Sequence, residues 1–360
     1  MDSGDPDVRI RAVTDAPHTV DEAAAYASER AEIFSGSHRA LFDRFVRQPI
    51  ELRQFAGPVQ HVNAVDHLRV AHLTDLHFGR VTPERVQREA VRLTNAKSPD
   101  LVVITGDFVC HSQMYLDQLT DVLSTIDAPV IGVLGNHDYW SGADGVRRAL
   151  ARAGVEVLRN RNTVITLRHE RLQVVGLDDA YTGHADREAA VAGLRHDLPT
   201  LGLSHIAEEA DWLWHHGVPL VLAGHTHAGQ VTLAHLHELA VGRLGGHKYV
   251  HGLYGSRAPN GNGDPPGALY VGAGIGAAVM PFRVGDRGRR EVALFELGLS
   301  LGSIDEHHVE QPPLAGRKPS RELTEKRRES VKKKEERRVR REAKEAARKA
   351  RDQRGGPPLS

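Results

Sequence analysis

The chain has 360 residues, of which 40% are hydrophobic and 26% charged, a composition that excludes wholesale disorder and predicts a globular, soluble protein with one large domain plus appendages, or two domains. A single cysteine, Cys110, excludes an internal disulfide, so nothing requires an oxidising compartment. The formal net charge is zero, but residues 317–354 hold 18 Lys and Arg against 8 Asp and Glu, whereas the remainder holds 29 against 39. This asymmetry predicts an acidic body with a basic tail.

The first 60 residues are predicted to form a helical extension. Residues 38–47 place apolar side chains at i, i+3 and i+4 opposite arginines, which indicates an amphipathic helix. It either packs on the main domain or attaches to anionic lipid at a membrane interface. The acidic start is followed by no apolar segment, so we expect no signal peptide.

From residue 68 the chain alternates between apolar strands and helices, which is typical of an α/β domain. The predicted helices cover 83–95, 114–126, 142–153 and 206–216. The predicted strands cover 68–74, 101–105, 130–134, 164–167, 172–177, 200–203, 220–223, 268–272 and 292–296. The loop 242–267 is rich in glycine and is predicted to be either a functional lid or simply mobile. The apolar run 267–282 is too short to cross a bilayer, so we expect no transmembrane segment.

Polar clusters recur where five of these strands end. His225 and His227 follow the strand 220–223, and residues at i and i+2 of an extended segment project to the same side. The other four clusters are Thr74-Asp75-Leu76-His77, Thr105-Gly106-Asp107, Gly135-Asn136-His137-Asp138 and Leu203-Ser204-His205. Each cluster alone is compatible with a turn or a helix cap. Because ligands bind outside the carboxyl ends of strands in open α/β sheets, five clusters in order predict one metal-lined cleft.

This ordered set of motifs resembles the calcineurin-like metallophosphoesterase superfamily, in particular its bacterial branch with Gly-Asn-His-Asp-Tyr-Trp and Gly-His-Thr-His-Ala-Gly-Gln. The resemblance covers about residues 66–298. It implies a four-layer α/β sandwich in which two mixed β-sheets are flanked by helices. Some members of this branch cleave lipid-linked diphosphates such as UDP-diacylglucosamine. Members often carry an amino-terminal membrane segment, and we expect none in this sequence, which makes a lipid substrate less expected.

The resemblance also implies two divalent metal ions, which would be manganese, iron or zinc. One ion would be held by Asp75, His77 and His227, the other by Asn136, His205 and His225, and Asp107 would bridge the two. A metal-bridging hydroxide would attack a phosphodiester, pyrophosphate or phosphomonoester in line. His137 would act as general acid or as a cationic donor to phosphate, with Asp138 orienting it.

Other residues near these motifs allow two interpretations each. Arg283 is the candidate contact for a substrate phosphate, with a surface salt bridge as the alternative. Asp178 and Asp179 either aid the site or form a turn. Cys110 is expected to be a small buried side chain.

The final segments are predicted to be a linker over 299–320 and a basic helical tail over 321–354. The tail pairs Glu322 with Lys326, Glu329 with Lys333, Glu336 with Arg340 and Glu345 with Lys349 at i, i+4. Its charge would attract an anionic membrane surface or nucleic acid. The sequence therefore predicts a cytoplasmic phosphohydrolase that either stays in solution or attaches peripherally to a membrane. Two alternatives remain: a nuclease-like protein that uses the tail, and a non-catalytic scaffold.

Overall fold

The structure, a computed structural model, describes residues 49–229, 246–258, 267–277, 283 and 288–314, together with Glu329, Lys333, Glu336 and Arg340. The chain divides into two units, Met1–Arg47 and Gln48–Ser360, and every described residue lies in the second. The amphipathic helix predicted over 38–47 lies outside the described residues, as do most of the predicted tail helix and parts of the loop 242–267. Among the described residues, no helix is long and apolar enough to cross a membrane.

The first sheet has six strands, with four parallel neighbours at one side. β2, β3, β4 and β5 run parallel, β12 is antiparallel to β2, and β1 pairs parallel with β12 at the edge. In spatial order the strands are β1 (Glu51–Ala56), β12 (Glu291–Leu297), β2 (Leu68–Leu73), β3 (Leu101–Thr105), β4 (Val130–Val133) and β5 (Val155–Val157).

The second sheet is also mixed and has six strands. β11, β9, β8 and β7 run parallel, while β10 and β6 are antiparallel to their neighbours at the two edges. In spatial order the strands are β10 (Gly252–Gly255), β11 (Ala268–Val271), β9 (Leu220–Ala223), β8 (Thr200–Leu203), β7 (Glu170–Gly176) and β6 (Arg161–Leu167).

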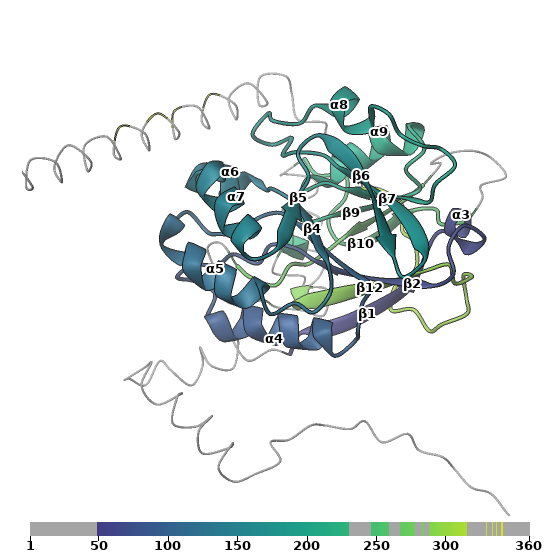
Figure 1. Cartoon of the computed structure of the whole chain (residues 1–360), viewed down its shortest axis with the longest axis horizontal. Helices are drawn as coiled ribbons and strands as arrows, with labels where there is room; N and C mark the ends of the chain where they lie inside the picture. Colours follow the sequence, from purple (N-terminus) through teal and green to yellow (C-terminus); the bar gives the residue numbers. More distant parts are fainter. Residues whose placement is uncertain are drawn as a thin grey trace, which may run out of the picture. The chain divides into compact units, whose positions relative to one another are not determined.

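Three apolar cores separate four layers. Alternate residues of a strand point to opposite faces, so on β3 Leu101 and Val103 join the core between the sheets while Val102 and Ile104 join the core under the helices. The third core lies outside the second sheet and contains Trp214. Strands buried on both faces read as continuous apolar runs, which explains why they were visible in the sequence. The predicted sandwich of two mixed sheets flanked by helices is confirmed (Figure 1).

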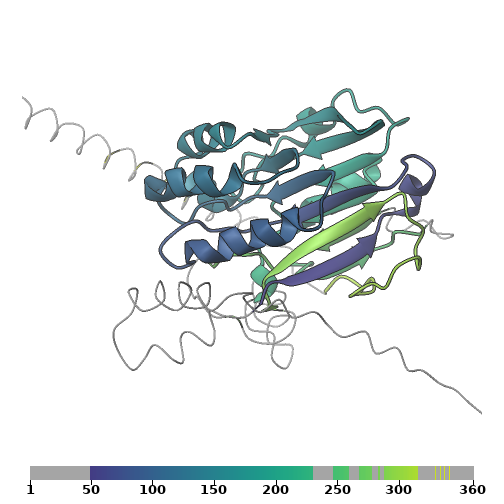
Figure 2. The ribbon, with the colours of Figure 1, turned by 60° about the horizontal axis from the view of Figure 1, so that its bottom comes forward.

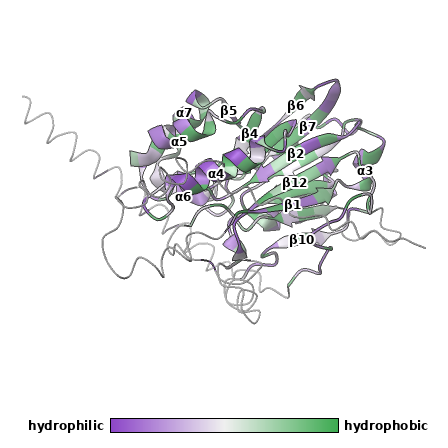
Figure 3. Cartoon of the chain, turned by 90° about the horizontal axis from the view of Figure 1, so that it is seen from below, coloured by the Kyte–Doolittle hydropathy of each residue, from purple (hydrophilic) through white to green (hydrophobic). Residues whose placement is uncertain are grey.

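The helices cover the outer faces of the two sheets, as Figure 1 and Figure 2 show. α4 buries Val86, Ala90, Val91 and Thr94 along one stripe, and its exposed side carries ion pairs such as Arg88 with Glu84. Figure 3 shows this division between purple helix surfaces and green strands. The first sheet is covered by α4 (Glu84–Asn95), α5 (Leu116–Leu123) and α7 (Ala143–Arg152), and the second by α8 (Arg187–Val191) and α9 (Ala210–His215). The remaining short elements are α3 (Val59–Val62), η1 (Gln113–Tyr115), α6 (Asn136–Ser141), η2 (Ala207–Glu209) and η3 (His227–Gly229).

Three segments differ from the predicted secondary structure or domain boundaries. Residues 51–56, placed by the sequence in a helical extension, form the edge strand β1. Residues 252–255, placed in a loop, form β10. Part of the predicted linker 299–320 packs on the second sheet, where the Gln311 backbone N–H donates to the Leu253 carbonyl over 3.0 Å. The domain therefore begins before residue 66 and extends past residue 298.

Candidate metal centre

The predicted ligands lie together at the carboxyl ends of β2, β3 and β4 in the first sheet and of β8 and β9 in the second. The parallel direction of these strands brings their ends to the same edge of each sheet. Asp75, His77, Asp107 and His227 offer ligand atoms that all lie within 4.8 Å of one another. The sequence-based expectation that separate strands supply one site agrees with this arrangement.

The first group of side chains consists of Asp75, His77 and His227. The Nε2 atoms of His77 and His227 face each other at 2.9 Å. Oδ1 of Asp75 lies 3.3 Å from His227 Nε2 and 3.9 Å from His77 Nε2. Three donor atoms of the kind that bind transition metals thus converge on one point.

The second group consists of Asn136, His205 and His225. His205 Nε2 lies 3.2 Å from Asn136 Oδ1 and 3.3 Å from His225 Nδ1. The other nitrogen of His205, Nδ1, lies 2.7 Å from the Thr105 carbonyl oxygen, to which it donates. That bond orients the ring with Nε2 toward the cluster, as a backbone carbonyl does for many metal-binding histidines.

Asp107 lies between the two groups and turns one carboxylate oxygen to each. Its Oδ2 is 3.6 Å from His77 Nε2, and its Oδ1 is 3.4 Å from His205 Nε2. Burial opposes the charge of this carboxylate, but His205 and His137 lower its pKa well below the usual range. The geometry is that of a carboxylate able to serve two adjacent ions.

The backbone at the cluster is strained. Five of the seven predicted ligands have φ between 45° and 76°, in the left-handed region: Asp75, His77, Asp107, His225 and His227. Such conformations cost about 1–3 kcal/mol each and concentrate at functional sites. Close approach also requires glycine at position 224, where a Cβ atom would lie 2.0 Å from Thr74 Oγ1 and 2.5 Å from Asp75 Oδ2.

The charges and hydrogen bonds of the cluster fit a bound cation. Oδ2 of Asp75 accepts hydrogen bonds from Thr74 and from the His225 backbone, whereas the buried Oδ1 has no hydrogen-bond donor among the described residues. Burial, and after it the charge of Asp107, raises the pKa of Asp75 to about 6. Burial lowers the pKa of His77 to about 3 and that of His227 well below its usual value, so both rings are neutral and able to bind metal. A divalent cation would offset two buried carboxylates and give Asp75 Oδ1 a partner.

His137 borders the cluster, and its side chain is 12% exposed, whereas those of His77 and His205 are fully buried. Its Nε2 lies 3.9 Å from Asp107 Oδ2, and its backbone N–H donates to Asp107 Oδ1 over 2.8 Å. This position suits a group that meets both the cluster and a molecule arriving from solvent.

The predicted orienting role of Asp138 does not match its contacts. The two oxygens of its buried carboxylate accept the backbone N–H groups of Gly135, over 2.9 Å, and Val109, over 3.1 Å. Asp138 is the third residue of α6, where an acidic side chain folds back on the residue that caps the helix. Asp138 therefore shapes the loop that carries Asn136 and His137.

The predicted contact between Arg283 and a substrate phosphate is also replaced by internal bonds. Arg283 is fully buried and donates to the carbonyl oxygens of Ala273, Gly276 and Gly288. Its Nη2 lies 3.2 Å from His227 Nδ1. Arg283 is therefore held by backbone carbonyl groups beside the ring of His227.

Two aspartates near the site have structural contacts. Asp178 accepts hydrogen bonds from Tyr139, over 2.5 Å, and Arg159, over 3.2 Å, and so ties α6 to the end of β7. Asp179 is buried and accepts the Thr182 backbone N–H over 2.7 Å. Both contacts agree with the turn interpretation.

Two aromatic residues that the sequence analysis did not select border the cluster. The Trp140 ring lies 4.7 Å from that of His137, and the Tyr181 ring lies 5.4 Å from that of His225. Both rings are partly exposed. The position of Trp140 three residues after His137 was the available signal, because i and i+3 lie on one face of a helix.

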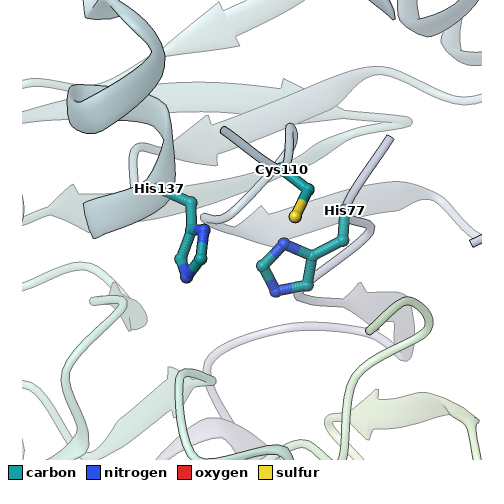
Figure 4. A group of neighbouring side chains, drawn as sticks. All are labelled: His77, Cys110 and His137. Atoms are coloured by element: carbon teal, nitrogen blue, oxygen red, sulfur yellow. The ribbon is translucent and has the colours of Figure 1, made fainter. Parts of the chain in front are cut away.

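Cys110 is buried, as expected, but it also lies beside two histidines of the site. Figure 4 shows its sulfur next to the ring of His77, with the ring of His137 farther away. Ligand atoms of these three residues lie within 4.8 Å of one another. Burial, and after it the charge of Asp107, raises the pKa of the thiol to about 11.

Comparison with known proteins agrees with this geometry. Residues 68–229 match the family model of calcineurin-like phosphoesterases. The chain is 31% identical over 169 residues to phosphodiesterase YaeI of Escherichia coli (strain K12), an alignment covering 45% of this chain and 62% of YaeI. It is 26% identical over 238 residues to the uncharacterized metallophosphoesterase YkuE of Bacillus subtilis (strain 168), covering 64% of this chain and 79% of YkuE.

A third relative is the UDP-2,3-diacylglucosamine pyrophosphatase LpxG of Chlamydia muridarum (strain MoPn / Nigg), 25% identical over 214 residues, covering 46% of this chain and 65% of LpxG. The chain thus spans less than two thirds of YaeI and of LpxG. The matched region 68–229 contains every predicted metal ligand, and the family is metal-dependent. By motif order and matched region, residues 68–229 are similar to the calcineurin-like metallophosphoesterases.

Proposed function

We propose that the protein is a dinuclear metal-dependent phosphohydrolase. Asp75, His77 and His227 would hold one divalent ion, Asn136, His205 and His225 would hold the second, and Asp107 would contact both. The observation that carries the proposal is the carboxylate of Asp107, whose two oxygens face two different histidines at 3.6 and 3.4 Å. A carboxylate with a purely structural role would not require metal-binding side chains beside each of its two oxygens, so this arrangement supports a role in binding two ions.

The ions, when bound, would supply Lewis-acid stabilisation of the phosphate oxygens and an acidified water as nucleophile. The protein supplies the rest. Neutral imidazole ligands, unlike carboxylates, would leave the charge of bound divalent ions largely uncancelled, and the net positive charge would attract phosphate. His137, partly exposed beside Asp107, is placed to donate a proton to the leaving oxygen or to stabilise its charge.

The substrate class that the relatives favour is a phosphodiester or a diphosphate. One relative is named a phosphodiesterase and another a pyrophosphatase. His137 is partly exposed to solvent, and the partly exposed Trp140 ring lies 4.7 Å from its ring. We therefore propose a phosphate ester with a bulky group on its leaving side, and we rank phosphomonoesters below diesters.

Replacement of Asp107 by alanine tests the proposal directly. D107A should bind less than one equivalent of metal in place of two and lose more than about 10³-fold in turnover, since several kcal/mol of charge stabilisation disappear. The assay is elemental analysis of protein reloaded separately with manganese, zinc, iron or magnesium, followed by hydrolysis of bis(p-nitrophenyl) phosphate and p-nitrophenyl phosphate.

The matched control is D117A, because Asp117 on α5 has a 97% exposed side chain, which lies 3.4 Å from the exposed Arg152. D117A should keep both metals and full turnover. If D107A retained two equivalents of metal and comparable turnover, the dinuclear assignment would be wrong.

A further inference from the structure

Cys110, His77 and His137 form a second cluster of metal-binding atoms next to the proposed dinuclear centre. One ligand atom from each lies within 4.8 Å of the others, and Figure 4 shows the thiol directed toward the two rings. One sulfur and two imidazole nitrogens are a soft donor set, which selects zinc, cadmium or copper(I) over magnesium, calcium or manganese. The proposed dinuclear ligands, in contrast, are oxygen and nitrogen atoms.

The two nitrogens of His77 face in different directions. Nε2 faces His227 and Asp75 at the proposed dinuclear centre. Nδ1 is buried and has no hydrogen-bond partner among the described residues. Figure 4 shows the Cys110 sulfur beside this ring. A metal-bound histidine normally gives its second nitrogen an oxygen partner, so a buried imidazole nitrogen that meets a thiol is unusual.

Access to this cluster is possible from the side of His137. The His137 side chain is 12% exposed, whereas His77 is fully buried and Cys110 is 9% exposed.

From this geometry we infer a third metal site, formed by Cys110, His137 and Nδ1 of His77, that binds a soft cation and inhibits the enzyme. Binding of the ion releases the thiol proton, and it releases the Nδ1 proton of His77 when Nε2 already holds an ion. The soft cation would occupy His137, which then can no longer serve the leaving oxygen. It would also share His77 with the neighbouring ion. Occupancy of the site does not depend on the proposed function; inhibition does.

Cadmium is the probe, because a cadmium–thiolate bond has an ultraviolet charge-transfer band and Cys110 is the chain's one cysteine. Full-length protein reloaded with manganese is titrated with cadmium. We expect the band to saturate at one equivalent, to be absent from C110S, and to need at least 10-fold more cadmium in H137Q. Magnesium and calcium should produce no band. Absence of the band from folded wild-type protein at saturating cadmium would overturn the site.

Inhibition is measured in parallel, with each variant normalised to its own turnover without cadmium. Cadmium or excess zinc should reduce wild-type turnover at least 10-fold at concentrations that leave more than half of C110S or C110A turnover. Equal sensitivity of wild type and both variants would overturn the inhibitory role. If cadmium gave the band but no ester were hydrolysed, the site would stand and the proposed function would fail.

Discussion

At the residue scale, we propose two roles for the histidines of the site: His77, His205 and His227 would hold metal, and His137 would act on substrate. His205 is fixed by a bond from Nδ1 to the Thr105 carbonyl oxygen, and His77 and His227 are buried with lowered pKa values. His137 is the partly exposed ring beside Asp107. The four histidines thus differ in burial and in hydrogen bonding, although all belong to the predicted motifs.

His137→Ala should retain both metals and lose about 10² to 10⁴ in turnover, the range of a general acid or charge stabiliser. None of the proposed ligands changes in this variant, so the metal content should stay within error of wild type. The loss should be smaller for nitrophenyl esters, whose leaving oxygen needs little protonation, than for alkyl esters. Equal losses on both ester types would leave electrostatic stabilisation as the role and exclude proton donation.

The sequence was sufficient to predict which side chains meet at the site, because each lies directly after an apolar strand and parallel strands bring such positions together. It was insufficient for Asp138 and Arg283. Asp138 belongs to a motif, but its carboxylate is used by the backbone of Gly135 and Val109. Arg283 is buried by segments distant in sequence, and a sequence pattern carries no information about such burial.

At the scale of the elements, strands with long apolar runs were predictable, whereas the polar edge strand β1 was not. β3 is apolar except for its last residue, Thr105, and was predicted with its observed bounds. β1 contains Glu51, Arg53 and Gln54, which suggested an exposed helical extension. In the folded protein Arg53 pairs with the buried Glu291 over 2.5 Å, so long-range ion pairing accommodates polar residues in an edge strand.

The short helix α3 provides a test of stability against pH through His61. His61 is fully buried, its Nε2 donates to the Thr200 carbonyl over 3.2 Å, and burial lowers its pKa from 6.5 to about 4. Because the unfolded chain binds this proton more readily, stability falls as pH drops from 6.5 to 4 and changes no further below 4. Between pH 7 and pH 5, protonation of His61 in the unfolded chain lowers the free energy of unfolding by about 2 kcal/mol.

The H61Q variant keeps a hydrogen-bond donor at this position but has no side chain that titrates in this range. Its free energy of unfolding should therefore fall by about 2 kcal/mol less than that of wild type between pH 7 and pH 5. The measurement is urea unfolding of both proteins at each pH, and the comparison of slopes removes any constant cost of the substitution. H196Q is the control, because His196 is an exposed histidine on the loop before β8. Identical pH dependence of H61Q and wild type would show that His61 is not the titrating group.

At the scale of the whole molecule, charge is distributed unevenly along the chain. Residues 317–354 contain 18 basic and 8 acidic residues, whereas the remainder contains 29 and 39. The described tail residues are helical and exposed, and Lys333 lies 3.8 Å from Glu329, one of the predicted i, i+4 pairs. Such exposed pairs contribute little to stability, so we expect the tail to act through its total charge.

Deletion of residues 317–360 should leave turnover on a small soluble ester within about twofold, because the described tail residues supply no atom to the metal centre. The same deletion should weaken sedimentation with anionic vesicles, since each basic residue near a charged membrane contributes about 1 kcal/mol. The effect should be largest at low salt and fade as the ionic strength rises toward 0.15 M, where the Debye length is about 8 Å. A parallel filter-binding assay with DNA and RNA separates the two candidate polyanions, and neutral vesicles serve as the control. Equal binding of the truncated and full-length proteins to every polyanion at low ionic strength would show that the tail is no electrostatic anchor.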